Sequence, residues 1–224
     1  MDVVLLEGVT KTYRTRDGHR RIILNDVSIA FPAGSRVGIL GGNGAGKSTL
    51  LRLIAGSEPP DAGRIERYAR VSFSMGFSGT FHGGLSGREN VLFLARLYGA
   101  DPRRVLDFVA DFAELGVWLD MPVETYSSGM VAKLAFGVSL AIDFDVYLVD
   151  EITEVGDARF RARSAQALRE RLRDTSLILV SHSSSTIRGL CDRCAILQEG
   201  QLIPFDTVDE AMSAYAKLLG VPHA

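Results

Sequence analysis

A glycine-rich run between an apolar segment and a helix-forming segment constrains this chain more than any other feature. The run Gly41-Gly-Asn-Gly-Ala-Gly-Lys-Ser48 fits the pattern G-x-x-x-x-G-K-[ST]. Apolar residues 36–40 before it predict a short strand, and residues 47–55 after it predict a helix that Gly56 ends. A strand, a glycine loop and a helix in this order indicate a phosphate-binding loop (P-loop) and not a chance glycine-rich turn.

Each residue type in the P-loop has a chemical reason for its position. Glycines allow successive backbone N–H groups to turn toward an anion, and the helix N-terminus adds positive potential. Lys47 supplies a cation for the outer phosphates, and the Ser48 hydroxyl can ligate Mg²⁺. The predicted nucleotide-binding residues in this segment are Gly41, Gly42, Asn43, Gly44, Ala45, Gly46, Lys47, Ser48 and Thr49.

Two acids that follow a second apolar segment supply the carboxylates that such a site needs. Residues 146–149 predict a buried strand, and Asp150 and Glu151 come directly after it. Adjacent acids after a strand commonly form only a solvated loop, but downstream of a P-loop they favour catalysis. We expect Asp150 to join Ser48 in binding Mg²⁺ and Glu151 to orient or deprotonate the attacking water.

A histidine after a third apolar segment is a further catalytic candidate. His182 follows residues 176–181, which predict another buried strand. A lone histidine is more often structural, but ligands of α/β sheets bind at the carboxyl ends of the strands. We therefore group His182 with Glu151 and Lys47 as predicted catalytic residues, with a hydrogen bond from His182 to the γ-phosphate.

The order of the remaining patterns predicts an α/β fold, namely a P-loop NTPase core with an antiparallel β subdomain and an inserted helical lobe. Residues 3–9 and 21–31 predict antiparallel strands, and glycine-rich residues 71–88 predict one long loop. Capping signals at Ser86 and Asp101 predict helices. We expect one domain over residues 1–224, with a core of 1–70 and 143–224 and a lobe of 71–142.

Composition excludes some other classes. With 25 lysines and arginines against 27 aspartates and glutamates, the formal charge of −2 gives no support to a nucleic-acid binder. No apolar run approaches the roughly 18 residues that span a bilayer, and no signal peptide is evident, so we expect a cytoplasmic protein. Cys191 and Cys194 lack the second pair of ligands that zinc needs, and we expect them to be ordinary thiols.

Together these residues resemble the ATP-binding subunits of ABC transporters over nearly the whole chain. Lys47 precedes Asp150 by 103 residues and His182 follows it by 32, separations similar to those of that family. The segment Tyr126-Ser-Ser-Gly-Met130 stands where the family has its LSGGQ signature. Ser127 and Gly129 match that signature, whereas Ser128 and Met130 depart from it.

The resemblance implies several roles that the residues alone do not. In this family the signature binds the ATP of a second copy, which implies a homodimer in which Ser127, Ser128, Gly129 and Met130 complete the partner's site. Asp157 matches the aspartate that bridges the two copies, and Tyr13 matches the aromatic residue that stacks on adenine. The cofactors implied are ATP and Mg²⁺, and the reaction is hydrolysis of ATP to ADP and phosphate.

One departure indicates a subgroup. The family has a glutamine in the loop that links nucleotide to transporter, and no glutamine occurs between Arg70 and Val91. This segment, with residues 111–116, 126–130 and 155–160, resembles ATPase subunits that export capsular polysaccharide. The resemblance implies export of a lipid-linked capsular polysaccharide, powered from the cytoplasmic face of the inner membrane. The ATPase would be held there by an integral permease docked at Phe73–Gly84, and we expect Phe77→Ala or Phe81→Ala to uncouple export.

Two alternatives stay open at this stage. One is an ATPase subunit for another glycan, such as O-antigen or teichoic acid. The other is a soluble ABC ATPase outside transport, although such proteins usually carry a long coiled-coil insertion or two ATP domains, and neither pattern occurs here. A regulatory GTPase is disfavoured because the chain has no Asn-Lys-x-Asp run.

Overall fold

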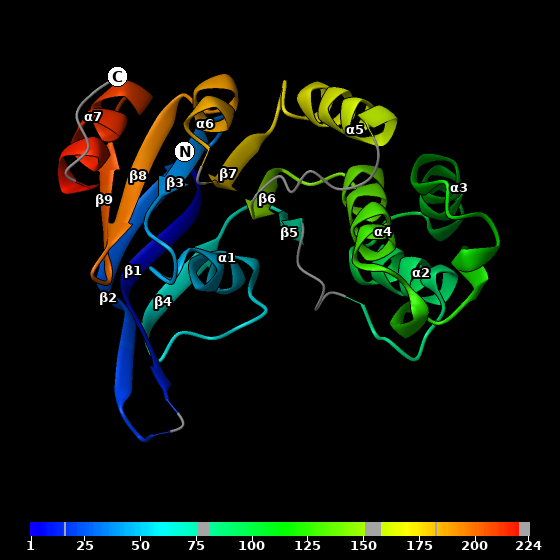
Figure 1. Ribbon diagram of the computed structural model, residues 1–224, viewed down its shortest axis with the longest axis horizontal. Helices are drawn as coiled ribbons and strands as arrows, with labels where there is room; N and C mark the ends of the chain where they lie inside the picture. Colours follow the sequence, from blue (N-terminus) through cyan, green and yellow to red (C-terminus); the bar gives the residue numbers. More distant parts are fainter. Residues whose placement is uncertain (16, 76–80, 151–157, 182, 220–224) are drawn as a thin grey trace. The chain divides into compact units, whose positions relative to one another are not determined.

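A computed structural model of the chain describes residues 1–15, 17–75, 81–150, 158–181 and 183–219 (Figure 1). The chain divides into two compact units. The first contains Met1–Ser74, Asp145–Glu151 and Thr175–Ala224, and the second contains Met75–Phe144 and Ile152–Asp174. The helix that follows the acidic pair thus groups with the helices of the second unit, whereas the sequence-based division placed residues 143–224 in the core.

The first unit contains a three-stranded sheet in the order β2-β1-β4. Its strands are β1 (Asp2–Arg14), β2 (Arg20–Pro32) and β4 (Ala62–Arg67), and β1 pairs antiparallel with both neighbours. The predicted antiparallel pair is confirmed. Both strands extend beyond their predicted bounds, so β1 reaches Tyr13, which pairs with Arg21 of β2.

The same unit contains a six-stranded sheet in the order β5-β6-β7-β3-β8-β9. Its strands are β5 (Val71–Met75), β6 (Val146–Asp150), β7 (Ser176–Val180), β3 (Arg36–Leu40), β8 (Arg193–Gln198) and β9 (Gln201–Phe205). Strand β3 pairs parallel with β7 and β8, and β6 pairs parallel with β7. The predicted hairpin at Glu199-Gly200 joins β8 to β9, and both of these residues have the positive φ, 49° and 78°, of a tight hairpin turn.

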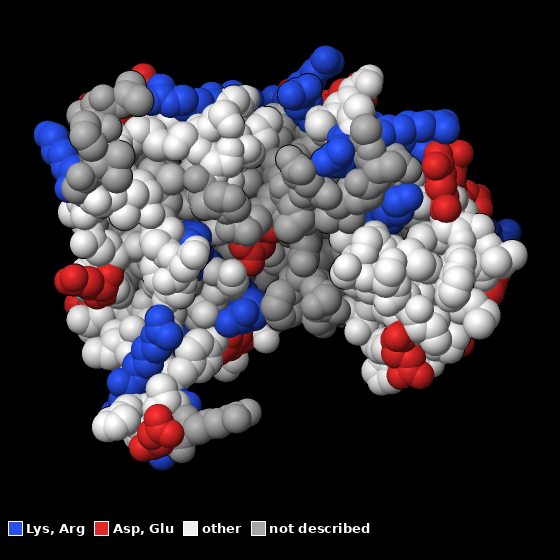
Figure 2. Space-filling model, in the orientation of Figure 1, with Lys and Arg blue, Asp and Glu red and all other residues white. Residues whose placement is uncertain are grey.

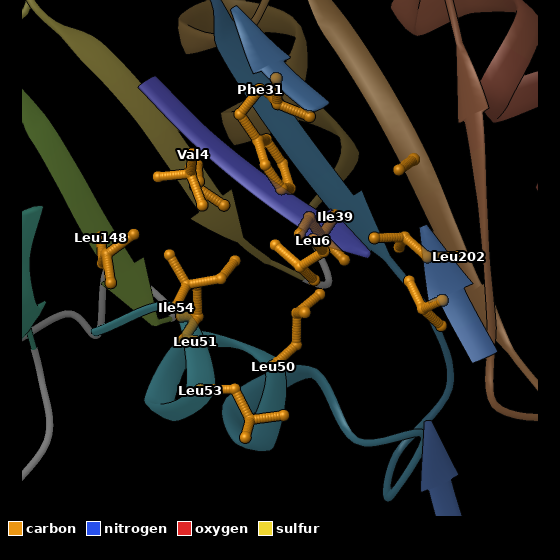
Figure 3. Packing of buried hydrophobic residues seen from close by; sticks show 14 of the residues in the cluster. Val4, Leu6, Phe31, Ile39, Leu50, Leu51, Leu53, Ile54, Leu148 and Leu202 are labelled. Atoms are coloured by element: carbon orange, nitrogen blue, oxygen red, sulfur yellow. The ribbon is translucent and has the colours of Figure 1, made fainter. Parts of the chain in front are cut away.

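Helix α1 (Lys47–Ala55) packs its apolar side chains against strands of both sheets (Figure 3). Leu50, Leu51 and Ile54 are fully buried together with Leu6 of β1 and Ile39 of β3. Because burying an aliphatic side chain of this size stabilises a fold by about 1.5–3 kcal/mol, this cluster fixes the start of α1 against β3. Helices α6 (Ser184–Leu190) and α7 (Val208–Leu219) complete the unit.

The second unit is helical. Its elements are α2 (Gly87–Leu97), α3 (Pro102–Ala113), η2 (Gly116–Asp120), η3 (Val123–Thr125), α4 (Ser128–Ala141) and α5 (Ala158–Arg171). The predicted caps are present: Ser86 and Glu89 form a reciprocal capping box, and Asp101 accepts from the N–H groups of Arg103 and Arg104 at 2.8 and 3.1 Å. Phe112, Leu140 and Phe160 bring α3, α4 and α5 together in a small core.

The prediction of one long loop over residues 71–88 is wrong, because β5 occupies its first five residues. The segment Val71-Ser-Phe-Ser-Met75 alternates apolar and polar side chains as a strand does, and the glycines that follow obscured this pattern. Ser72 accepts a hydrogen bond from the N–H of Leu148 in β6 at 2.9 Å. Strand β4 was also missed, because half of its sequence, AGRIER, is charged and it has no regular apolar alternation.

We predict that Ser86→Ala lowers the free energy of unfolding by about 1 kcal/mol, because it removes the cap that accepts from the Glu89 N–H. Urea denaturation followed by circular dichroism measures the change. The control is Ser213→Ala, an exposed serine inside α7, where alanine is at least as favourable as serine. Equal denaturation midpoints for Ser86→Ala and the unmodified chain would show that the cap contributes nothing.

Candidate nucleotide site

The P-loop leaves the central part of the six-stranded sheet and enters α1 with no room for side chains at two positions. A Cβ on Gly41 would lie 2.6 Å from the carbonyl oxygen of Leu197 in β8. Gly46 has φ 107°, and a Cβ there would lie 2.4 Å from Cγ2 of Ile23 in β2. Both distances are shorter than nonbonded contacts allow, so these glycines are required by packing as well as by the motif.

Lys47 is folded back over the loop. Its side-chain nitrogen donates to the carbonyl oxygens of Gly41 at 2.8 Å and Gly42 at 3.0 Å, and the residue is only 8% exposed. Among the residues that the structure describes, no side chain caps the N-terminus of α1. The first N–H groups of the helix therefore have no side-chain cap, and the Lys47 ammonium lies against the loop that precedes them. Both are donors of the kind that bind a phosphate.

Ser48 and Thr49 have different surroundings in the first turn of α1. Ser48 is exposed, so its hydroxyl is accessible to a metal ion. Thr49 is buried, and its Oγ1 accepts a hydrogen bond from Nη2 of Arg52 at 3.0 Å. The geometry suits Ser48 as an oxygen ligand and gives Thr49 a packing role in the helix.

Asp150 lies at the same edge of the sheet as the P-loop. It ends β6 and pairs with Val180 of β7, and Val180 pairs in turn with Ile39, just before the end of β3. Its half-buried carboxylate is an oxygen ligand of the kind that Mg²⁺ prefers. The predicted residues Glu151, Asp157 and His182 lie outside the described residues, so their assigned roles stay predictions.

Tyr13 comes close to the P-loop through the pairing of β1 with β2. Its partner in the register, Arg21, donates from Nη2 to the carbonyl oxygen of Gly44 at 2.8 Å. Two residues further along β2, Ile23 packs against Gly46. The structure thus brings the predicted base-stacking residue and the predicted phosphate cradle to one region of the first unit. Arg21 and Ile23 were not predicted, because nothing in the sequence fixes which residues of β2 face the loop.

The hydroxyl of Tyr13 is held by a charged cluster, also not predicted. It lies 2.7 Å from both carboxylate oxygens of Glu58 and accepts from Nη2 of Arg52 at 3.1 Å. The Lys11 ammonium lies 3.0 Å from Glu58 and 3.3 Å from Asp61. Burial alone would raise the pKa of Glu58, but hydrogen bonds from Tyr13, Lys11 and Arg52 outweigh it and hold this pKa below its usual value.

The signature segment begins α4 in the second unit. Ser127 caps the helix and accepts from the N–H of Met130 at 3.3 Å. Ser127 and Ser128 are exposed, Gly129 and Met130 are half-buried, and a Cβ on Gly129 would meet nothing nearer than Ser127 Oγ at 3.9 Å. An exposed N-terminus of a 14-residue helix with an exposed serine can accommodate an anion.

The two cysteines have no features of a reactive pair. Both thiols are free, and burial raises the pKa of Cys191 to about 12 and that of Cys194 to about 11. Thiols with such pKa values stay protonated near neutral pH and are poor nucleophiles. These values support the interpretation of Cys191 and Cys194 as ordinary thiols.

Comparisons with known proteins identify the family of this chain. Residues 24–154 match the ABC transporter family. The chain is 46% identical to the capsule polysaccharide export ATP-binding protein CtrD of Neisseria meningitidis, over 96% of this chain and all of that protein. It is 44% identical to the polysialic acid transport ATP-binding protein KpsT of Escherichia coli, over 95% of this chain and 96% of that protein.

A solved structure shares the fold at low sequence identity. The dimeric post-hydrolysis state of an ATP-binding cassette bound to ADP and phosphate superposes with a TM-score of 0.74. The match covers 89% of this chain and 96% of the other, with 22% identity. The predicted P-loop NTPase fold is confirmed, and the chain belongs to the ABC transporter family as an ATP-binding, ATP-hydrolysing domain.

Proposed function

We propose that this chain is the ATP-hydrolysing subunit of a transporter that exports capsular polysaccharide. The observation that carries the ATPase part is the uncapped N-terminus of α1, with the Lys47 ammonium held over the P-loop carbonyls. The polysaccharide part is supported by CtrD and KpsT, which match almost over their full lengths and are named for capsule polysaccharide export and polysialic acid transport.

The proposed chemistry transfers the terminal phosphoryl group of ATP to water. Lys47 and the N–H groups at the start of α1 hold the phosphates, and the cation and dipole stabilise charge that develops on their oxygens. The exposed Ser48 hydroxyl and the Asp150 carboxylate are the oxygen ligands that would hold Mg²⁺, which neutralises phosphate charge when bound. Glu151 orients the attacking water and takes its proton, ADP leaves, and His182 hydrogen-bonds the γ-phosphate.

The working unit in this proposal is a homodimer. Ser127 lies in the second unit at an exposed helix start, and its proposed ligand is the ATP held by the P-loop of another copy. Asp157 is proposed to bridge the two copies. The dimeric state of the solved cassette supports this arrangement.

The proposed membrane partner is an integral permease, which would hold the chain at the cytoplasmic face of the inner membrane. Among the described residues, no helix combines the length and apolar character needed to cross a bilayer.

Basic and acidic side chains are both present on the face drawn in Figure 2, in keeping with a formal charge of −2.

The structure changes which residues are suitable contacts for the permease. Phe73 and Phe81 are only 7% and 9% exposed, so their rings are parts of the core and not contacts, and Phe77 lies outside the described residues. Phe81→Ala would therefore destabilise the fold by about 3–5 kcal/mol and could not report on docking alone. Next in the chain, α2 exposes 57% of Phe93 and 62% of Leu97, one turn apart. We therefore extend the proposed docking surface to these two side chains.

For hydrolysis we predict that Glu151→Gln still binds ATP but turns it over on the order of 100-fold or more slowly, because the amide cannot act as a base. Phosphate release from the purified chain measures turnover, and size-exclusion chromatography with MgATP measures dimer formation. The control is Glu170→Gln, a change of the same type at an exposed position on α5. Near-normal turnover in Glu151→Gln would refute the role of Glu151.

For docking we predict that the double variant Phe93→Ser, Leu97→Ser retains only a small part of the permease that co-purifies with the unmodified chain from native membranes. The reason is that exposed apolar side chains often contribute most of the binding energy of an interface. Thermal unfolding should be unchanged, since both side chains are exposed. Leu218→Ser on α7, where the leucine is 50% exposed, is the matched control. Full retention of the permease by the double variant would place the docking surface elsewhere.

A further inference from the structure

The hydroxyl end of Tyr13 is tied to two elements that flank the phosphate site. Glu58 belongs to the segment between α1 and β4, and Arg52 lies in α1. Arg52 donates to the Tyr13 hydroxyl at 3.1 Å, to Glu58 through Nε at 3.1 Å and to Thr49 Oγ1 at 3.0 Å. A continuous chain of hydrogen bonds therefore runs from the Tyr13 ring to the residue that follows Ser48.

The segment that carries Glu58 is itself anchored to β1. Asp61 accepts from the backbone N–H of Thr12 at 2.7 Å and from its hydroxyl at 2.9 Å. Lys11 donates to the carbonyl oxygen of Pro59 at 2.9 Å, and its side chain is only 9% exposed. Glu58 thus stands at a fixed place relative to the strand that carries Tyr13, so it can restrain the ring and does not merely follow it.

The Tyr13 ring lies at a partly exposed position, where hydrogen bonds to its hydroxyl can limit its motion. Tyr13 is half-buried near the end of β1, and residues 14, 15 and 17–22 after it are exposed. The ring packs against the core of the first unit but is only partly buried, so any freedom that it retains must be lost when it stacks on a ligand. The Lys11 ammonium lies over the ring, 5.7 Å from its centroid, so a stacked base would take the opposite face.

We propose that Glu58 and Arg52 are positioning residues that hold the Tyr13 ring ready to stack on the base of the nucleotide. This inference rests on the proposed function, because it requires Tyr13 to contact the base of bound ATP. Since Arg52 also bonds Thr49, the same side chain sets the distance between the base platform and the start of α1. Neither residue belongs to the P-loop run 41–48, so we expect the cluster to act on base recognition and not on the chemical step.

The test compares a ligand that has a base with one that lacks it. Calorimetric titration of the purified full-length chain gives the Kd of MgATP and of magnesium tripolyphosphate for each variant. Glu58→Gln weakens the acceptor of the Tyr13 hydroxyl, and Tyr13→Phe removes the hydroxyl but keeps the ring. We expect both to raise the Kd of ATP by about three- to tenfold and to leave that of tripolyphosphate within about twofold. Loss of the ring in Tyr13→Ala raises the Kd of ATP by roughly five- to a hundredfold.

A second tyrosine–glutamate pair in the same unit provides matched controls. The Tyr68 hydroxyl donates to Glu66, and Tyr68 is 56% exposed. Tyr68→Phe and Glu66→Gln repeat the two chemical changes outside the proposed site, and we expect no change in either Kd. The variant with both Tyr13→Phe and Glu58→Gln should bind ATP no more weakly than the worse single variant, because both changes break one interaction.

Each outcome decides the proposal. Unchanged ATP binding in Glu58→Gln and Tyr13→Phe, with a loss in Tyr13→Ala, would overturn the positioning role and leave base stacking intact. No loss in Tyr13→Ala would overturn the stacking itself. Equal weakening for ATP and tripolyphosphate would show that the cluster supports the whole fold of the site, which also overturns the proposal. If thermal unfolding shows that Glu58→Gln does not fold, Tyr13→Phe decides by the same criteria.

Discussion

Two glycines without room for a Cβ determine how the nucleotide site is built. At Gly41 the backbone lies close to the Leu197 carbonyl of β8, and at Gly46 it lies close to the Ile23 side chain of β2. These contacts pin the P-loop between strands of two different sheets. Helix α1 begins directly after these contacts, and the Lys47 ammonium donates back to the loop carbonyls. The buried leucines of α1 stabilise this arrangement by packing in the core of the first unit.

The parts that could be predicted from the sequence are those with a local cause. Strand β3 and helix α1 have the predicted bounds, because glycines stand close to both ends of each. Strand β6 covers the predicted apolar run 146–149 and also includes Asp150. The cap at Ser86 was predictable for the same reason, because both partners lie within four residues. Strand β4 was not, because it carries charged side chains at an edge of the sheet, where pairing with β1 and not hydrophobic periodicity determines its structure.

The surroundings of Tyr13 could not be predicted, because they depend on the register between distant segments. The pairing of β1 with β2 shifts between Val9 and Lys11 and again between Lys11 and Thr12. Each irregularity changes which side chains of β2 face the P-loop, so the approach of Arg21 to Gly44 has no signal in the sequence. Glu58 stands in the run Ser57-Glu-Pro-Pro, which suggests a solvated turn, although its carboxylate joins Tyr13, Arg52 and Lys11.

The departure of the signature segment from its family pattern is tolerable for a physical reason. A serine hydroxyl has one donor and two acceptor sites, and Ser127 uses only an acceptor when it caps the Met130 N–H. This hydrogen bond therefore leaves the proton of Ser127 for the contact with a phosphate oxygen that we propose. Ser128, in place of the first glycine, is exposed in the first turn of α4, where a β-carbon meets no packing constraint of the kind found at Gly41. The signature segment can thus vary where the P-loop cannot, because the role proposed for it needs an exposed helix start and not a buried crossing of strands.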